Sequence, residues 1–171
     1  MRNKADLHNS WAFTYCLPDT PLGPLTLSFS SRGLAVLTYA EAKAAVRSAS
    51  PPGAVAVWVE KAKKELAGYF AGSPTTFASL PLDPQGTPFQ LRVWQELRQI
   101  PWGRTISYKE LAVRAGSPRA CRAVGQANGA NPIPLIIPCH RVIAADGSLG
   151  GYSSGLPRKK WLLEHEKKNN H

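Results

Sequence analysis

The sequence predicts an α+β protein with two domains, and three observations support this prediction. Strand-like runs dominate the start of the chain, helices with clear capping residues dominate its second half, and a Pro- and Gly-rich stretch over residues 73–86 lies between them. The length of 171 residues allows one large domain or two small ones, and the hydrophobic content of 43% is sufficient for a buried core. We therefore expect an N-terminal α/β domain with its linker over residues 1–85 and a C-terminal domain over residues 86–171.

The N-terminal domain is predicted to hold three strands and a helix. Residues 12–17, 25–30 and 34–39 are rich in β-branched and aromatic side chains and are bounded by Pro and Gly, which is typical of strands. Residues 31–33, Ser-Arg-Gly, suggest a hairpin turn between the second and third strands. A helical pattern follows over residues 57–72, with Gly at its end and a common apolar side made by Val59, Ala62, Leu66, Tyr69 and Phe70.

Capping residues define the helices of the second half. Thr87, Pro88 and Gln90 match an N-cap, a first helical position and the third residue of a capping box. The apolar stripe of this helix consists of Phe89, Val93, Trp94, Leu97 and Ile100. Ser107 and Glu110 suggest a second capping box, in a helix that ends at Gly116.

A helix-turn-helix and a hairpin complete the predicted C-terminal domain. A third capped helix is expected to start at Ser117 and Pro118, so that two helices joined by a short turn form a helix-turn-helix. A hairpin around Asp146 and Gly147 and a final helix over residues 157–168 follow. This is the order of a winged-helix domain; many such domains bind DNA, and some make only protein contacts.

The positive charge of the chain is concentrated in its second half. The net charge is +10; residues 86–171 carry 13 Lys and Arg against 5 Asp and Glu, whereas residues 1–85 carry 8 against 6. A basic domain beside a nearly neutral one suggests a polyanion partner, although a basic surface can also serve solubility alone. The second helix of the helix-turn-helix carries four small residues beside the basic Arg119 and Arg122; the small residues are Cys121, Ala123, Gly125 and Ala127. These small side chains would let a nucleic-acid backbone approach the helix closely. The alternative is that they pack on the preceding helix.

The three cysteines do not form a recognisable framework. They are odd in number and contain no C-x-x-C pair, which argues against disulfides and against a structural zinc site. The first residues lack the apolar segment of a secretory leader, and no stretch approaches the roughly 18 apolar residues of a membrane span. We expect a soluble, cytoplasmic protein with reduced thiols, no membrane contact and no bound metal.

Cys139 and His140 are the candidate reactive pair. They follow Pro138 inside an apolar run, IIPCHRVI, where a buried cysteine is usually an inert small hydrophobe. A histidine nearby changes this interpretation, because a base that takes the thiol proton makes sulfur nucleophilic. On an extended strand the two side chains would point to opposite faces, so we expect His140 to act through a water molecule.

Glu166 is the candidate partner that would orient His140. It lies four residues after Leu162 and three after Leu163, which places it on the apolar face of the last helix, whereas Glu164 points away. A carboxylate on that face must be hydrogen-bonded, and a histidine donor would satisfy it. The alternative is that Glu166 reaches solvent near the helix end.

These motifs resemble the O6-alkylguanine-DNA alkyltransferase family, the methylated-DNA–protein-cysteine methyltransferases. The resemblance covers about residues 86–167 and is carried by TPFQ, ISYKELA, RAVG, NPIP, IPCHRVI, GYS and WLLEHE. It implies a ribonuclease-H-like N-terminal domain and a winged-helix-like C-terminal domain that binds the minor groove of double-stranded DNA and flips out the damaged base. Cys139 would take the alkyl group from O6-alkylguanine irreversibly, His140 would accept the thiol proton through water, and Glu166 would hold His140.

The resemblance also implies roles for other residues. Asn131 would tie the recognition helix to the active-site loop, Tyr108 would help to rotate the nucleotide, and Arg122 would replace the flipped base in the stack. The substrate would be enclosed by Pro134 on the alkyl side and by Tyr152 and Ser153 on the far wall, while the carbonyls of Cys139 and Val142 would read the exocyclic amine. DNA contacts are expected along the recognition helix, at Arg119, Cys121, Arg122, Ala123 and Gly125.

The resemblance also sets what we do not expect. Some members of the family bind zinc in the N-terminal domain, but here Cys16 is accompanied only by His8, so no metal and no cofactor are predicted. We expect a monomer without an obligate protein partner. Two rival functions are a DNA-binding regulator without catalysis and a cysteine hydrolase; the latter needs an oxyanion hole, for which PCHR offers no glycine-rich loop. The preferred adduct depends on pocket volume, and the sequence leaves open whether O4-alkylthymine is a second substrate.

Overall fold

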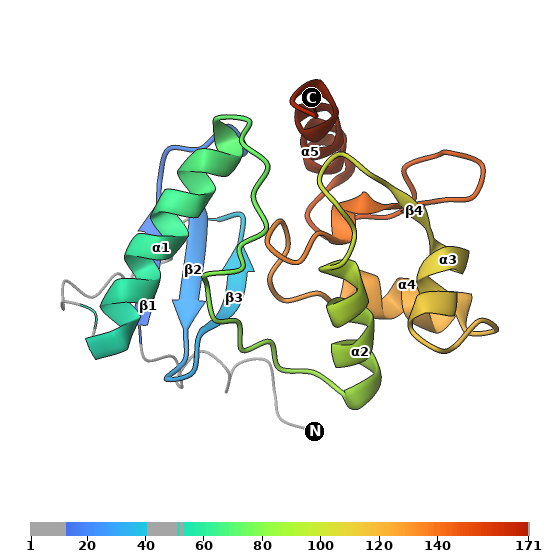
Figure 1. The fold of residues 1–171 in the computed structure, drawn as a ribbon, viewed down its shortest axis with the longest axis horizontal. Helices are drawn as coiled ribbons and strands as arrows, with labels where there is room; N and C mark the ends of the chain where they lie inside the picture. Colours follow the sequence, from blue (N-terminus) through green and yellow to red (C-terminus); the bar gives the residue numbers. More distant parts are fainter. Residues whose placement is uncertain (1–12, 41–50, 52, 171) are drawn as a thin grey trace.

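The computed structural model describes residues 13–40, 51 and 53–170, and it divides into a sheet-containing N-terminal half and a helical C-terminal half (Figure 1). The first half contains an antiparallel sheet in the order β1-β2-β3, formed by β1 (Phe13–Leu17), β2 (Leu25–Phe29) and β3 (Leu34–Thr38). The predicted turn joins β2 to β3, where the Ser30 amide donates to the Gly33 carbonyl at 2.9 Å. The three strands and the hairpin are therefore confirmed.

Helix α1 (Gly53–Phe70) packs across one face of this sheet (Figure 1). It begins four residues before the predicted start, and its buried side chains are Val55, Val59, Ala62, Leu66 and Tyr69, which recur at helical spacing. Gly72 follows the helix at φ +87°, and a Cβ there would lie 2.6 Å from the Asn169 side chain. The predicted stop therefore reflects both a left-handed backbone and a close approach by the C-terminal end of the chain.

The segment predicted as a linker is bonded to the sheet. The Leu34 amide donates to the Pro81 carbonyl at 2.9 Å, and the Asp83 amide donates to the Leu34 carbonyl at 2.7 Å. Asp83 also accepts from the Ser30 hydroxyl at 2.7 Å and pairs with Arg32 at 2.7 Å. These contacts fix the path from the first half of the chain to the second.

The C-terminal half begins with α2 (Pro88–Leu97), whose capping box has both of its hydrogen bonds. In α3 (Tyr108–Arg114) the Ser107 hydroxyl accepts from the Glu110 amide, but the Glu110 carboxylate pairs with Arg114 instead of completing the box. The third helix, α4 (Cys121–Gly129), starts later than predicted. Ser117 accepts from the Ala120 amide in a separate turn, so Ala120 precedes the helix and Ser117 does not cap it.

The predicted wing forms a turn without a pair of strands. The Ala144 amide donates to the Ser148 carbonyl at 2.9 Å around Asp146 and Gly147, but the described residues after this turn form no strand. Instead β5 (Val142–Ile143) pairs in parallel with β4 (Ile106–Ser107), which had not been predicted. The hairpin prediction was wrong as a strand pair, because the two-residue strand is paired with an earlier segment of the chain. The chain then enters α5 (Leu156–Lys168).

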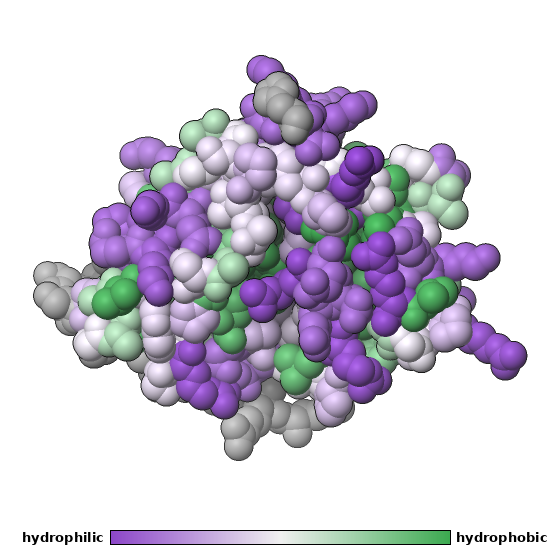
Figure 2. Space-filling model, viewed as in Figure 1, coloured by the Kyte–Doolittle hydropathy of each residue, from purple (hydrophilic) through white to green (hydrophobic). Residues whose placement is uncertain are grey.

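A single hydrophobic cluster connects the two halves. It includes Phe29 and Leu66 of the first half together with Trp94, Ile133 and Leu162 of the second. In the view of Figure 2, hydrophilic side chains cover most of the surface, and apolar groups are visible in the seam between the halves. Within the described ranges, no helix is both long and apolar enough to cross a membrane.

Candidate active site

Cys139 occupies a short 3₁₀ turn, Cys139–Arg141, directly after Pro138. The thiol is almost fully buried, with 1% of the residue exposed, as are His140 and Arg141. The sequence-based expectation of an extended strand at this point was wrong. A 3₁₀ turn rotates successive side chains by about a third of a turn, so His140 does not point directly away from Cys139.

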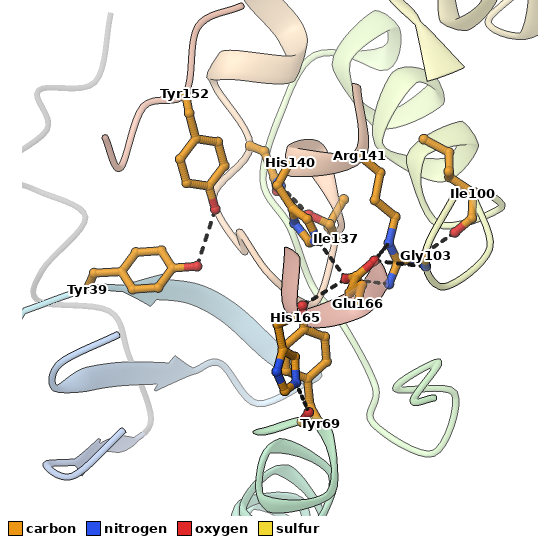
Figure 3. A network of polar contacts seen from close by, with 11 residues as sticks. Tyr39, Tyr69, Ile100, Gly103, Ile137, His140, Arg141, Tyr152, His165 and Glu166 are labelled. Atoms are coloured by element: carbon orange, nitrogen blue, oxygen red, sulfur yellow. Dashed lines mark hydrogen bonds and ion pairs between the residues drawn. The ribbon is translucent and has the colours of Figure 1, made fainter. Parts of the chain in front are cut away.

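Glu166 lies at the centre of a buried hydrogen-bond network (Figure 3). Its Oε1 is 2.7 Å from His140 Nε2, and it accepts from the Tyr69 hydroxyl at 2.8 Å. Arg141 donates its Nε to Oε2 at 2.8 Å and its Nη2 to Oε1 at 3.0 Å, while the Gly103 amide donates to Oε2 at 3.1 Å. The predicted contact with His140 is therefore present, and Glu166 does not reach solvent.

The network fixes the charge of Glu166 and the tautomer of His140. Burial by itself would raise the pKa of Glu166, but the hydrogen bonds and charges of His140 and Arg141 outweigh it and hold that pKa well below its ordinary value. Burial lowers the pKa of His140, against the opposing effect of Glu166. A neutral His140 beside an ionised carboxylate carries its proton on Nε2, so Nδ1 is the free base; Nδ1 is buried and has no hydrogen-bond partner in the described part of the chain.

The surroundings of Cys139 favour the neutral thiol. Burial raises the pKa of Cys139 to about 11, although the side chain of Asn131 and the charge of Lys159 act in the opposite direction. The thiolate is therefore not formed in advance at neutral pH, and a nearby base must take the proton as sulfur reacts.

Two asparagines connect α4 to the cysteine turn. Asn131 donates its Nδ2 to the Ile137 carbonyl at 2.7 Å and accepts from the Ile133 amide at 3.0 Å. Asn128, on the buried face of α4, donates to the Cys139 carbonyl at 3.4 Å. These contacts hold the loop before Cys139 against the end of the helix.

Lys159 is a buried cation that sequence reasoning missed. Its side chain is fully buried, and its Nζ donates to the carbonyls of Val142 at 2.6 Å, of Gly151 at 3.3 Å and of Leu149. Burial lowers the pKa of Lys159 to about 8, while a charge on Cys139 would raise it. The ammonium thus joins the start of α5 to the loops on both sides of the Asp146–Gly147 turn.

The predicted substrate-wall residues come from several segments of the C-terminal half and differ in exposure. Tyr108 is the half-exposed first residue of α3, and a Cβ on Gly150 would lie 3.1 Å from its ring. Tyr152 is half-buried, and its hydroxyl is 3.2 Å from that of Tyr39 in the first half of the chain (Figure 3). The remaining members are the buried Pro134 and Val142 and the exposed Ser153; the Val142 carbonyl already accepts from Lys159.

The exposed surface of α4 and its preceding turn carries the predicted DNA contacts. Residues Arg119, Cys121, Arg122 and Ala123 are exposed, and Gly125 is half-buried. Ala127 does not belong to this surface, because the helical period turns Val124, Ala127 and Asn128 into the core. The Ala127 carbonyl accepts from the Trp94 indole at 2.8 Å, so this residue packs against α2.

Three residues of the site were missed by the sequence analysis, and two of them had a signal in the sequence that could have identified them. Lys159 lies three residues before Leu162 and seven before Glu166, so helical spacing places all three on one face and could have identified it. Arg141 stood in the same apolar run as Cys139, which was a second signal. Tyr69 looked like a core residue of α1, and nothing local indicated its contact with Glu166.

The predicted absence of a metal stays a prediction. No group of three or more His, Cys, Asp or Glu side chains is arranged to hold a metal ion in the part of the chain that the structure describes. His8 lies outside the described residues.

Family models that match this chain, and curated relatives that resemble it, are named as methyltransferases of 6-O-methylguanine DNA or of methylated DNA. A family model described as the 6-O-methylguanine DNA methyltransferase DNA-binding domain matches residues 88–168, and one described as the ribonuclease-like domain matches residues 13–84. The methylated-DNA–protein-cysteine methyltransferase of Methanosarcina barkeri is 44% identical over 161 residues, which are 91% of this chain and 98% of that protein. The protein of the same name from Mycobacterium tuberculosis strain H37Rv is 47% identical over 154 residues, 87% of this chain and 89% of that protein.

A solved structure of a protein similar to this chain contains bound DNA. The crystal structure of Mycobacterium tuberculosis OGT in complex with DNA has a TM-score of 0.78 and 44% sequence identity, and the match covers 92% of this chain and 94% of that one.

Proposed function

Because this chain belongs to the family of methylated-DNA–protein-cysteine methyltransferases, it is a DNA-binding protein that repairs DNA by alkyl transfer, and we propose that Cys139 accepts the alkyl group from O6-alkylguanine. The observation that carries this assignment is a buried Cys139 directly followed by a buried His140, whose Nε2 is 2.7 Å from Glu166 and whose Nδ1 has no partner among the described residues. Of the other cysteines, Cys16 is half-buried and Cys121 is exposed.

The transfer step requires one proton to leave the thiol as sulfur attacks. A water molecule would pass the Cys139 proton to His140 Nδ1, the sulfur–carbon bond would form, and the bond from the alkyl carbon to guanine O6 would break with its electron pair on guanine. Guanine then takes up one proton, for which the Tyr108 hydroxyl is the proposed donor. Solvent would return a proton to Tyr108 and accept the proton held by His140, so protons balance. Glu166 would stabilise the imidazolium that His140 becomes, as the carboxylate of a catalytic triad does.

The walls of the site suit a neutral aromatic base. We assign Pro134 to the alkyl side, and Tyr152 and Ser153 to the far wall. The carbonyls of Cys139 and Val142 each have one described donor besides the secondary-structure bonds, Asn128 and Lys159 respectively. The Cys139 carbonyl already accepts from the Val142 amide and, at 3.4 Å, from Asn128, so the exocyclic amine of guanine would replace the long Asn128 contact there. The Val142 carbonyl, which accepts from Lys159, would take the amine on its second lone pair.

DNA would be bound by the exposed side of α4. Its basic residues, Arg119 and Arg122, are exposed, and the small side chains of Cys121, Ala123 and Gly125 would let the DNA backbone come close. Arg122 would enter the stack as the base leaves it. Minor-groove binding, the domain boundary between residues 85 and 86, a monomeric state and a cytoplasmic location stay predictions.

Repair is expected to be stoichiometric. A thioether has no good leaving group, so the alkylated Cys139 would not be restored. The moles of guanine repaired should therefore reach a plateau at the moles of protein, whereas turnover beyond one equivalent would contradict this proposal.

Intact-mass spectrometry tests the assignment directly. The protein is mixed with a duplex that contains O6-methylguanine, and the alkylated residue is located by peptide mapping. We expect one methyl group on Cys139 and none after Cys139→Ser, with duplex binding largely kept because phosphate contacts dominate affinity. Cys16→Ser and Cys121→Ser are the matched controls and should react like the unmodified protein.

The same experiment separates the rival functions. A DNA-binding regulator without catalysis would gain no mass, and a cysteine hydrolase would return to its starting mass. A methyl group found on Cys121 at a comparable rate would contradict the assignment of Cys139.

A further inference from the structure

A hollow of about 570 Å³ lies between the two halves of the chain, next to the proposed alkyl wall. Its lining includes Pro134 and Ser153, which we assigned to the substrate, together with Tyr39 from the N-terminal half and Arg158 from α5. The proposed site for the base and its alkyl group therefore continues into a space that is larger than a methyl group needs.

Tyr39 stands where the proposed wall meets the hollow. Its hydroxyl is 3.2 Å from that of Tyr152, and Figure 3 shows the two side chains pointing their hydroxyl groups toward each other across the boundary between the halves. Burial raises the pKa of Tyr39 above its ordinary value, the hydrogen bond with Tyr152 opposes this, and a charge on Cys139 would add to it. Tyr39 thus lies within electrostatic reach of the cysteine.

Arg158 gives the hollow a positive charge that no described carboxylate neutralises. Its guanidinium lies 5.1 Å from the centre of the Tyr39 ring. Nη1 donates to the Ser154 carbonyl at 2.9 Å and Nε to the Leu22 carbonyl at 3.4 Å, and none of the ion pairs among the described residues includes Arg158. An arginine has five N–H donors, so several remain for a ligand.

We propose that this hollow is a subsite for the distal part of a bulky O6 adduct, with a preference for an aromatic group that ends in an anion. The Arg158 guanidinium lies over the Tyr39 ring, and together the two planar groups supply a surface against which an aromatic group can pack, while the guanidinium also supplies donors for a carboxylate. The N-terminal half thereby helps to select the adduct, although the reacting groups lie in the C-terminal half. This inference rests on the proposed role of Cys139.

The test compares three adducts in otherwise identical duplexes: O6-methylguanine, O6-benzylguanine and O6-(4-carboxybenzyl)guanine. Single-turnover transfer is measured at saturating DNA for the unmodified protein and for Tyr39→Ala and Arg158→Gln. Two matched controls are used. Tyr39→Phe keeps the ring but loses the hydroxyl, and Lys160→Gln removes the same charge from an exposed neighbouring position of α5 that does not line the hollow.

The expected result is a change in the ratios of the rates. Tyr39→Ala should lower both benzyl-type rates relative to the methyl rate by about 2- to 10-fold, the usual worth of an aromatic pair. Arg158→Gln should lower the carboxybenzyl rate relative to the benzyl rate by about 2- to 10-fold, as expected for a partly shielded ion pair. Tyr39→Phe and Lys160→Gln should leave both ratios within about twofold of those of the unmodified protein.

Two outcomes would overturn the subsite. If Tyr39→Ala slows methyl and benzyl transfer by the same factor, Tyr39 acts only by holding Tyr152. If Lys160→Gln changes the carboxybenzyl-to-benzyl ratio as much as Arg158→Gln does, the preference reflects general charge and not the hollow. Failure of the proposed function is seen separately, as methyl transfer that persists in Cys139→Ser.

Discussion

At the residue scale, Cys139, the proposed alkyl acceptor, would react as a thiolate in a place that disfavours charge. Burial raises its pKa to about 11, so a simple alkylating reagent that attacks without help from His140 should find it unreactive at neutral pH. Under this proposal, alkyl transfer depends on His140 accepting the thiol proton while the substrate is bound, because Cys139 is not ionised beforehand at neutral pH.

Reaction with iodoacetamide should reveal this difference between the cysteines. We expect the exposed Cys121 to be labelled first, and the labelling rate of Cys139 to rise about tenfold for each pH unit up to about pH 11. Peptide mapping over a pH series measures both rates, with unfolded protein as the control, where burial no longer separates the sites. A Cys139 labelling rate that is already constant above pH 8 would contradict the raised pKa.

Glu166 and Glu164 form a matched pair on one helix. Glu166→Gln removes the ionised partner of His140 and Arg141, so we expect transfer to slow by about 10- to 100-fold, as when the residue behind a catalytic or metal-bound histidine is lost. Glu164→Gln, on the exposed face, should change the rate by less than about twofold. The rates are measured at saturating DNA on folded protein. Equal effects from the two substitutions would contradict the proposal that Glu166 orients His140.

The pH dependence of stability gives an independent check on Glu166. The pKa of Glu166 in the folded protein is lower than in the unfolded chain, so its ionised form contributes stability above pH 4.5 that is lost as the pH falls further. At neutral pH, Glu166→Gln should cost about 3–5 kcal/mol, because Arg141 would stay buried without its partner. Urea titrations between pH 7 and pH 3 should show the gap from the unmodified protein closing below pH 4.5; a constant gap would contradict the lowered pKa.

At the scale of an element, the helical period of α4 places its core-packing residues on one side and the proposed DNA-contacting residues on the other. Val124, Ala127 and Asn128 face the core, and the opposite surface presents Arg122 and small side chains. The helix therefore supplies a fixed position for an arginine at the surface that would meet DNA, while Asn128 links the same helix to the Cys139 carbonyl.

Arg122→Ala should impair base flipping and leave the chemistry intact. Extruding a base costs a few kcal/mol, and a side chain that fills the gap offsets part of it, whereas a free O6-alkylguanine base has no stack to leave. We therefore expect repair of duplex DNA to slow strongly at saturating DNA while the reaction with the free base barely changes. Arg119→Ala, in the turn before the helix, is the control for loss of charge. If Arg122→Ala slows both substrates by the same factor, it is not the intercalating residue.

At the scale of the whole molecule, a shared core and the Glu166 carboxylate both connect the two halves. Glu166 of α5 accepts from Tyr69 of α1, from Gly103 after α2 and from Arg141 of the cysteine turn. We therefore expect the halves to unfold together, since separating them would expose the core and leave Glu166 without its donors.

Tyr69→Phe tests this coupling. Loss of a buried hydrogen bond to a charged group should cost about 2 kcal/mol, which corresponds to a fall in Tm of roughly 4–8 °C for a chain of this size, with a single transition kept. Tyr39→Phe, whose partner is a neutral hydroxyl, should cost about half as much. Thermal unfolding followed by circular dichroism and by tryptophan fluorescence measures both; two separate transitions in the unmodified protein would contradict a shared core.

Local pattern explains what the sequence could predict. The capping box at Thr87, the helical stripe that ends in Tyr69 and the inward face shared by Leu162 and Glu166 involve residues within a few positions of each other, so backbone geometry alone relates them. The candidate reactive pair Cys139 and His140 was indicated by a motif of adjacent residues for the same reason, whereas the predicted role of Arg122 came from the resemblance. The resemblance to the family implied which of these residues would lie together in one site.

The sequence by itself thus determined the helices, the three strands of the first half and most of their buried faces, and it indicated the candidate reactive groups, because these depend on periods, caps and motifs that a short window contains. Only the tertiary structure decided which groups meet. The contact between Tyr69 and Glu166 joins positions 97 residues apart, and that between Tyr39 and Tyr152 joins positions 113 apart. The parallel pairing of β4 with β5, and the 3₁₀ turn that redirects His140, were also decided there. Such contacts depend on how whole elements pack, because the free energy of burying their common core, and not any local preference, brings these side chains together.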